Sequence, residues 1–208
     1  MSTSWNPLDK GPGTVLTGPA NLAASRSSSG NELCRAVHPL GSGKYFWSYK
    51  ITATNNNECN GVGIATASAS TGGYCGHTAA SLGYYSDTGN VYGLANDTVY
   101  TTLAAPLLNG NIDVAVDTII KKLWFRLNNG GWLNAAIGSQ NPATGLGGIS
   151  LAALSGTPIY PAFTLADPGN ASLAAFSSGS WPYAAPAGFT EVNPSAPAKV
   201  RTRAFIIG

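Results

Sequence analysis

Charged side chains are scarce in this chain. Only 10% of its 208 residues are Asp, Glu, Lys or Arg, and 11 basic against 9 acidic residues leave a formal net charge of +2. No block of like charge occurs, so the electrostatic footprint of a nucleic-acid-binding protein is missing. A weakly charged polar surface repels other copies little and is compatible with packing against neighbours. We therefore expect the chain to assemble with other proteins, including further copies of itself in a homo-oligomer. We expect it not to bind nucleic acid.

Long apolar runs and a secretory leader are also missing. No stretch approaches the roughly 18 apolar residues of a membrane-spanning helix, so we expect no membrane insertion. Residues 1–6 lack the basic start and apolar stretch of a signal peptide. The sequence predicts a protein made in a cytoplasm and not exported by that route.

Cysteine is rare, and its spacing excludes the common metal motifs. Cys34, Cys59 and Cys75 form no Cys-x-x-Cys pattern, and an odd number leaves one thiol unpaired within the chain. Two interpretations stay open. The three can be reduced, partly buried thiols, or they can supply a disulfide between neighbouring copies, formed after release into an oxidising medium.

Helix signals are almost absent, whereas strand signals recur. No long segment shows apolar residues at the 3.6-residue period with caps at its ends. Instead 26 glycines, 13 prolines and many asparagines separate short runs rich in Val, Ile, Thr and aromatic residues. This pattern is typical of many strands joined by turns. The expected strands are residues 44–52, 62–66, 112–117, 122–127, 159–165, 171–176 and 199–207, with a hairpin over 81–92 and an ordered loop over 140–154.

Two local features qualify these expectations. Pro161 lies inside the run 159–165, and because proline cannot donate to a sheet ladder, it favours an edge strand or a bulge. Trp124 and Phe125 are neighbours in an expected strand, so one should point into the core and the other outward. Trp47 is expected in the core.

Several sequence motifs follow one another in a characteristic order. They are GKYFW at 43–47, GVGIA at 61–65, LGYY at 82–85 with GNVY at 89–92, GNIDVAVD at 110–117, KLWFRLNNGGWL at 122–133, and the segments 141–145, 160–162, 182–184 and 186–189. Together they resemble the SPRY domain, in the variant common in bacteriophage and prophage proteins. Asn111, where that family usually has Asp, and residues 175–177, where it often has Asn-Phe-Gly, depart from the pattern.

The resemblance implies an all-β fold. Its members are two-sheet antiparallel β-sandwiches of the concanavalin A-like jelly-roll type, and the matching motifs place this SPRY-like domain over residues 1–190. Residues 191–208 lie outside the resemblance and are interpreted as a C-terminal extension, either an added strand or an arm between subunits.

The resemblance also implies where binding occurs, because SPRY domains generally bind partners through loops at one end of the sandwich. Aromatic side chains anchor protein interfaces and also stack on sugars. Either a protein or a host surface glycan could therefore be bound there. The candidate partner-binding or glycan-binding residues are Tyr84, Tyr85, Tyr92, Tyr100, Trp132, Trp181 and Tyr183.

Catalytic patterns are weak. His38 and His77 are the only histidines, and Cys75-Gly76-His77 shows no third group that could orient the imidazole. Glucanases share this fold class and use two carboxylates, but their Glu-x-Asp-x-x-Glu signature is missing; only Asp113 and Asp117 lie on one strand face. Calcium would need more carboxylates than residues 87–90 offer. We therefore expect no enzyme activity, metal or cofactor.

The leading hypothesis is a structural or adhesion protein of a bacteriophage virion, such as a capsid decoration, collar or tail-fibre component. Other virion proteins would then be its partners and the virion its location. The alternative is a lectin-like receptor-binding module for host surface glycan. A third interpretation is an enzyme acting on polysaccharide, for which we expect no turnover. An intracellular adaptor domain is a further interpretation, although no signalling domain accompanies it.

Overall fold

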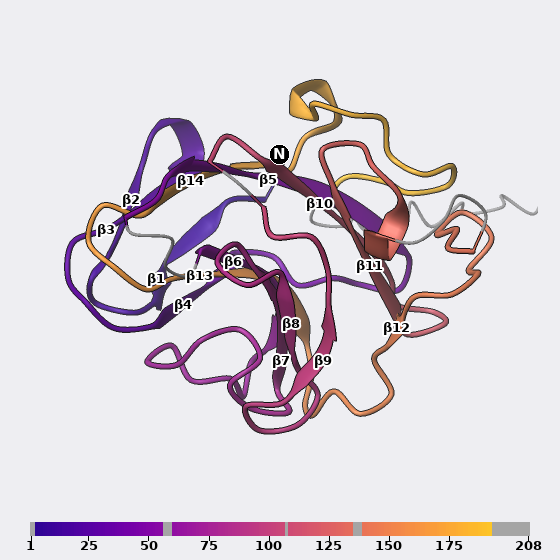
Figure 1. Ribbon diagram of the computed structural model, residues 1–208, viewed down its shortest axis with the longest axis horizontal. Helices are drawn as coiled ribbons and strands as arrows, with labels where there is room; N and C mark the ends of the chain where they lie inside the picture. The colour runs from indigo at the N-terminus through magenta and orange to yellow at the C-terminus, as the bar shows by residue number, and fades with distance from the viewer. Residues whose placement is uncertain (1–2, 56–59, 107, 135–138, 193–208) are drawn as a thin grey trace, which may run out of the picture.

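The computed structural model describes residues 3–55, 60–106, 108–134 and 139–192. These residues form two antiparallel seven-stranded sheets that pack face to face, as Figure 1 shows. Their helical content is limited to three short 3-10 turns, Pro19–Asn21, Trp132–Asn134 and Ser178–Ser180. The two-sheet antiparallel β-sandwich predicted from the sequence is confirmed.

The first sheet has the strand order β1-β4-β13-β6-β7-β8-β9. Its central strands join segments far apart in the sequence, since β13 pairs with β4 on one side and β6 on the other. The strands are β1 (Trp5–Lys10), β4 (Glu32–Ala36), β6 (Asn60–Thr66), β7 (Ser81–Tyr85), β8 (Asn90–Gly93), β9 (Val99–Thr102) and β13 (Ile159–Leu165).

The second sheet has the strand order β12-β11-β10-β5-β14-β3-β2. Its centre is the long strand β5, which pairs with β10 and β14. The strands are β2 (Thr14–Thr17), β3 (Ala23–Arg26), β5 (Lys44–Ala53), β10 (Asn111–Asp117), β11 (Lys122–Leu127), β12 (Ile149–Ser150) and β14 (Ala171–Ala175).

Side-chain alternation builds the core between the sheets. Along β5, Trp47 and Ile51 belong to the main core and are fully buried, while Phe46 belongs to a separate cluster on the outer face. The same alternation separates Phe125, in the main core, from Trp124, in the outer cluster. The expectations for Trp47 and for the Trp124–Phe125 pair are thus confirmed.

Both outer faces of the sandwich are also covered. A second buried cluster, which includes Cys75 and Tyr85, lies on the outer face of the first sheet. Gly83 of β7 shows how closely the covering loop approaches, because a Cβ added there would come within 2.5 Å of the Cys75 Cβ. On the second sheet the cover is residues 177–190, hereafter the strap.

One expectation about strand position is wrong. Pro161 lies in β13, a central strand rather than an edge strand. The ladder between β13 and β4 begins at Ala162, one residue later, whereas Pro161 pairs with Ile64 of β6. Proline is tolerated here because only one of the two ladders includes it.

The two ends of the described chain meet. The Thr3 amide donates a hydrogen bond to the Val192 carbonyl oxygen at 3.1 Å, and Val192 is fully buried. Residues 191 and 192 therefore pack with the sandwich, while residues 193–208, including the predicted strand 199–207, lie outside the described residues. Within the described ranges, no helix has the length and apolar character needed to cross a membrane.

Candidate binding surface

The outer face of the second sheet carries a row of four residues in register, three of them polar. Ser48 of β5 pairs with Asp113 of β10 and with Ala175 of β14, and Asp113 pairs in turn with Arg126 of β11. All four side chains point to the same side, because directly opposed residues of neighbouring strands share a face. The row lies beneath the strap.

Asp113 and Arg126 form a buried ion pair at the centre of this row. Arg126 Nε and Nη2 donate to Asp113 Oδ2 at 2.9 and 2.6 Å, and the two side chains are 10% and 0% exposed for Arg126 and Asp113. Burial raises the pKa of Asp113, and the charge and hydrogen bonds of Arg126 only partly oppose that shift. Arg126 therefore favours the ionised form of this buried carboxyl, against the effect of burial.

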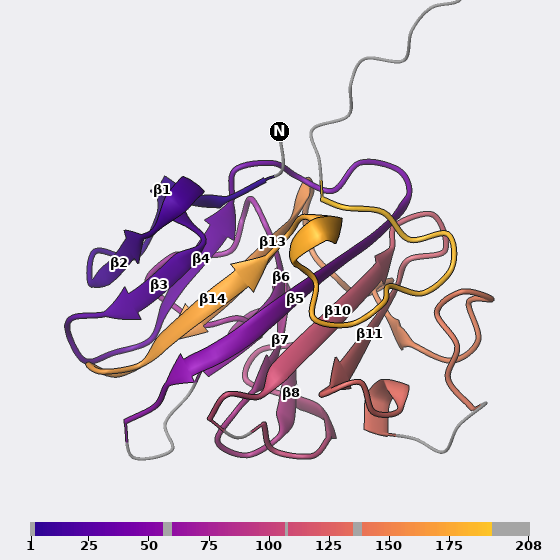
Figure 2. The same cartoon turned by 90° about the horizontal axis from the view of Figure 1, so that it is seen from above.

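The strap is fastened to this face by main-chain contacts. The Phe46 amide donates to the Thr190 carbonyl at 2.9 Å, and the Thr190 amide donates to the Lys44 carbonyl at 3.0 Å. Arg126 Nη2 also donates to the Ala184 carbonyl at 3.1 Å. Figure 2 shows the strap, in yellow, crossing over β5 and β10. The buried ion pair thus positions a surface segment 58 residues further along the chain.

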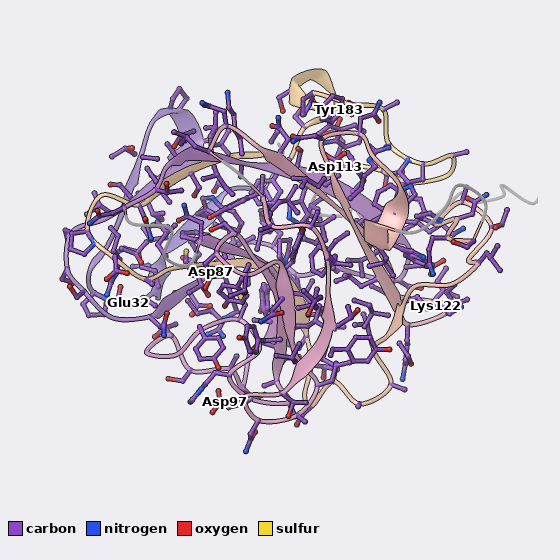
Figure 3. All side chains as sticks on the ribbon, in the orientation of Figure 1. Glu32, Asp87, Asp97, Asp113, Lys122 and Tyr183 are labelled. Atoms are coloured by element: carbon purple, nitrogen blue, oxygen red, sulfur yellow. The ribbon has the colours of Figure 1, made fainter. Side chains whose placement is uncertain are left out.

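The structure brings three of the predicted site residues to this face. Trp181 of the strap packs edge-on against Phe46, with ring centroids 4.8 Å apart. The Trp132 ring lies 4.6 Å from the Arg126 guanidinium carbon, a cation–π contact. Tyr183 is half-buried and lies on the same side of the molecule as Asp113 in Figure 3. Because each tryptophan ring packs against another group of the protein, neither ring is freely available to stack on a sugar.

Tyr84 and Tyr85 require a correction, because neither lies on a binding loop. Both belong to β7, an interior strand of the first sheet, and are 1% and 2% exposed. Tyr84 packs in the main core and donates its hydroxyl to the Ala104 carbonyl, while Tyr85 donates to the Cys75 carbonyl at 2.8 Å on the outer face. Their rings stabilise the sandwich and are not available to a partner.

Tyr92 and Tyr100 lie on the first sheet, away from the other candidates. Tyr92 is half-buried in β8 and packs edge-on against Tyr74 and Tyr85 at 5.9 and 5.6 Å. Tyr100 lies on the edge strand β9 and is 49% exposed. The predicted aromatic residues therefore do not form one site: the candidates divide between the two sheets.

The structure supplies an orienting group for His77 that the sequence did not reveal. His77 Nδ1 lies 2.9 Å from Asp97 Oδ1, and the Tyr74 hydroxyl donates to the same oxygen. The bond from Tyr74, followed by that of His77, lowers the pKa of Asp97. The neighbouring Cys75 is no nucleophile, since burial raises the pKa of its thiol to about 12. The contact between His77 and Asp97 joins the loop before β7 to the loop between β8 and β9.

The intermolecular disulfide prediction is also corrected for two of its three cysteines. Cys34 and Cys75 are free thiols, and both are 0% exposed. Burial raises the pKa of Cys34 as well, so neither sulfur is presented as a thiolate to a second chain. Cys59, the third candidate, lies outside the described residues.

The two carboxylates considered for glycoside cleavage serve structural contacts instead. Asp113 and Asp117 are 0% and 1% exposed. Asp117 Oδ1 accepts the amides of Ile119 and Ile120 at 2.9 and 3.2 Å, which closes the β10–β11 turn, and its other oxygen lies 3.7 Å from Lys44 Nζ. Within the described residues, no group of three or more His, Cys, Asp or Glu side chains could hold a metal ion.

Comparison with known proteins finds similar solved structures but no matching family model or curated protein. Among solved structures, the SPRY domain of human HERC1 superposes with a TM-score of 0.64 at 17% identity, covering 83% of this chain and 97% of that one. A human SPRY domain gives 0.60 at 14% identity, covering 78% and 94%. The TRIM65 PSpry domain gives 0.60 at 12% identity, covering 84% and 89%.

These likenesses establish the fold. Each structural neighbour is covered almost completely, so the chain contains the whole SPRY sandwich rather than a fragment of it. The SPRY fold predicted from the motif order is confirmed. At these identities the likeness concerns fold alone, and the bacteriophage and prophage variant remains a prediction.

Proposed function

We propose that this chain is a non-enzymatic structural or adhesion protein of a bacteriophage virion that acts through protein–protein assembly. A capsid decoration, a collar or a tail-fibre component would each use the sandwich as a rigid binding module. The observation that carries the proposal is the complete SPRY fold, because domains of this fold generally bind partners through surface loops. Fold alone does not specify a partner, so the surface must supply the further argument.

One end of the sandwich offers such a surface. Ile119 and Ile120, at the tip of the β10–β11 hairpin, are 65% and 46% exposed, and Leu146 is 51% exposed. A Cβ added to Gly145 would come within 2.8 Å of Ile120 Cδ1, so the turn that carries Leu146 lies beside the hairpin tip. Exposed apolar side chains that gather in this way favour contact with another protein.

The low charge of the chain and its phage-like motifs support the virion setting. With charged residues at 10% of the sequence, neighbouring copies repel one another little, which favours dense packing on a particle. The non-enzymatic part of the proposal is supported by the structural contacts of Asp113 and Asp117, the two carboxylates that share one strand face.

Mass spectrometry of purified particles tests this proposal. We expect peptides of this chain in particles banded by density and washed with high salt, at a constant ratio to the major capsid protein. Host cytoplasmic proteins in the same preparation are the control, since they should fall away with washing. Presence of the chain in the lysate together with its absence from washed particles would contradict the proposal.

A further inference from the structure

A cavity of about 230 Å³ opens on the outer face of the second sheet. Ser48, Lys50 and Asn111 of β5 and β10 form its polar side, and Leu173 of β14 contributes an apolar wall. Ser180 and Pro182 of the strap also line it. The cavity is separate from the exposed apolar end of the sandwich, and its lining residues include none of the aromatic residues predicted to bind.

A buried hydroxyl faces this cavity without a regular partner. Ser48 is 1% exposed, and its Oγ makes no hydrogen bond of ordinary geometry among the described residues. It lies near enough to the Asp113 carboxyl to help lower the pKa of that group, and because a hydroxyl has a single proton, it donates either to that carboxyl or to a ligand in the cavity. Buried polar groups normally have partners, so this hydroxyl on the cavity wall points to a ligand.

The charge at the cavity is positive and uncompensated. Lys50 is half-buried, and among the described residues its ammonium forms neither an ion pair nor a hydrogen bond. The acid on the same face, Asp113, is already neutralised by Arg126. The side-chain amide of Asn111 also makes no hydrogen bond within the described part of the chain, so its NH₂ group can donate.

We propose that this cavity binds a carboxylate of a partner protein, either an acidic side chain or a chain terminus. Lys50 would supply the charge, Ser48 and Asn111 the hydrogen bonds, and Leu173 with Pro182 the contact for the aliphatic stem. Charge-assisted hydrogen bonds to carboxylates are about twice as strong as neutral ones, which fits a site built from donors. The inference deepens the proposed function, on which it rests, by naming the chemical group that the partner presents.

Three small probes test the site by titration of the whole chain, followed by ¹H–¹⁵N NMR. Acetyl-glutamate amide carries a side-chain carboxylate, acetyl-glutamine carries only a terminal carboxylate, and acetyl-glutamine amide carries neither. We expect saturable shifts centred on Ser48, Lys50 and Asn111 with at least one of the first two probes and no such shifts with the third. The probe that binds identifies the source of the carboxylate.

Lys50→Gln is the matched variant, and Lys121→Gln, at an exposed lysine on the β10–β11 turn, is its control. Loss of the Lys50 charge should weaken the binding probe about tenfold, whereas the control should bind as the parent does. A dispersed spectrum verifies that each variant is folded. Equal shifts with the neutral probe, no saturable shift with any probe, or unchanged binding by folded Lys50→Gln would overturn the inference. Because the probes need no particle, a negative result here is distinguishable from a failure of the virion proposal.

Discussion

Replacing Arg126 by leucine is expected to lower the free energy of unfolding by about 3–5 kcal/mol at neutral pH. The substitution leaves the Asp113 carboxyl, which is 0% exposed, without its cation. It also removes the hydrogen bond to the Ala184 carbonyl and the contact with the Trp132 ring. The measurement is urea unfolding monitored by circular dichroism.

The same variant should depend on pH in a defined direction. Burial already raises the pKa of Asp113 in the folded protein, and removal of Arg126 takes away the main influence that lowers it. A group whose pKa is raised by folding favours the folded state below its unfolded pKa, about 4 for Asp, and loses that contribution as the pH rises. The penalty of Arg126→Leu should therefore shrink as the pH falls from 7 towards 4.

Two further variants make this result decisive. The double substitution Asp113→Leu with Arg126→Leu should recover most of the lost stability, because no charge remains buried. Lys121→Gln removes an exposed charge and should change the free energy of unfolding by less than about 0.5 kcal/mol. A penalty below about 1 kcal/mol for Arg126→Leu, the same at every pH, would show that the ion pair does not fasten the strap as described.

Trp5→Ala is expected to cost about 3–5 kcal/mol, the range of large aromatic truncations in protein cores. Trp5 lies near the N-terminus in β1, yet it is 0% exposed and packs edge-on against Phe163 and Phe176 at 4.6 and 4.8 Å. Phe163 lies in β13 of the first sheet, whereas Phe176 directly follows β14 of the second sheet. Trp5 therefore joins the two layers.

Leu8→Ala on the same strand is the matched control. Leu8 is 95% exposed, so its truncation should change the free energy of unfolding by less than about 0.5 kcal/mol. Both variants are compared by urea unfolding at one pH. Equal, small effects of the two substitutions would be incompatible with a core that includes the N-terminal strand.

The part of the fold that was predictable is the part with strong local patterns. The β10–β11 hairpin combines alternating apolar residues with an Asn-Asn-Gly-Gly turn after it, and the expected ranges 112–117 and 122–127 agree with the strands to within one residue. By contrast, β1 reads Trp-Asn-Pro-Leu-Asp-Lys and β2 is only four residues long, so neither shows a clear period. Such strands owe their conformation to tertiary packing.

The candidate site was less predictable from the sequence. When a loop covers the outer face of a sheet, the residues of the covered strand show no pattern that reveals it. Tyr84 and Tyr85 are adjacent in a strand, so one of them should be exposed on a bare sheet. Instead the loop that carries Cys75 covers the outer face and buries Tyr85 too. The Asp113–Arg126 pair depends on register across two strands, and His77–Asp97 joins residues 20 apart. These contacts follow from the fold and not from spacing in the sequence.

We propose that this sandwich works by non-covalent attachment to a particle, and cosedimentation tests that proposal most directly. Purified chain is titrated onto particles that lack it, without oxidant, and the bound fraction is measured after centrifugation. We predict saturation at a fixed number of copies per particle, in the presence of reductant as well as in its absence. A folded chain that stays in the supernatant at every concentration would contradict the claim.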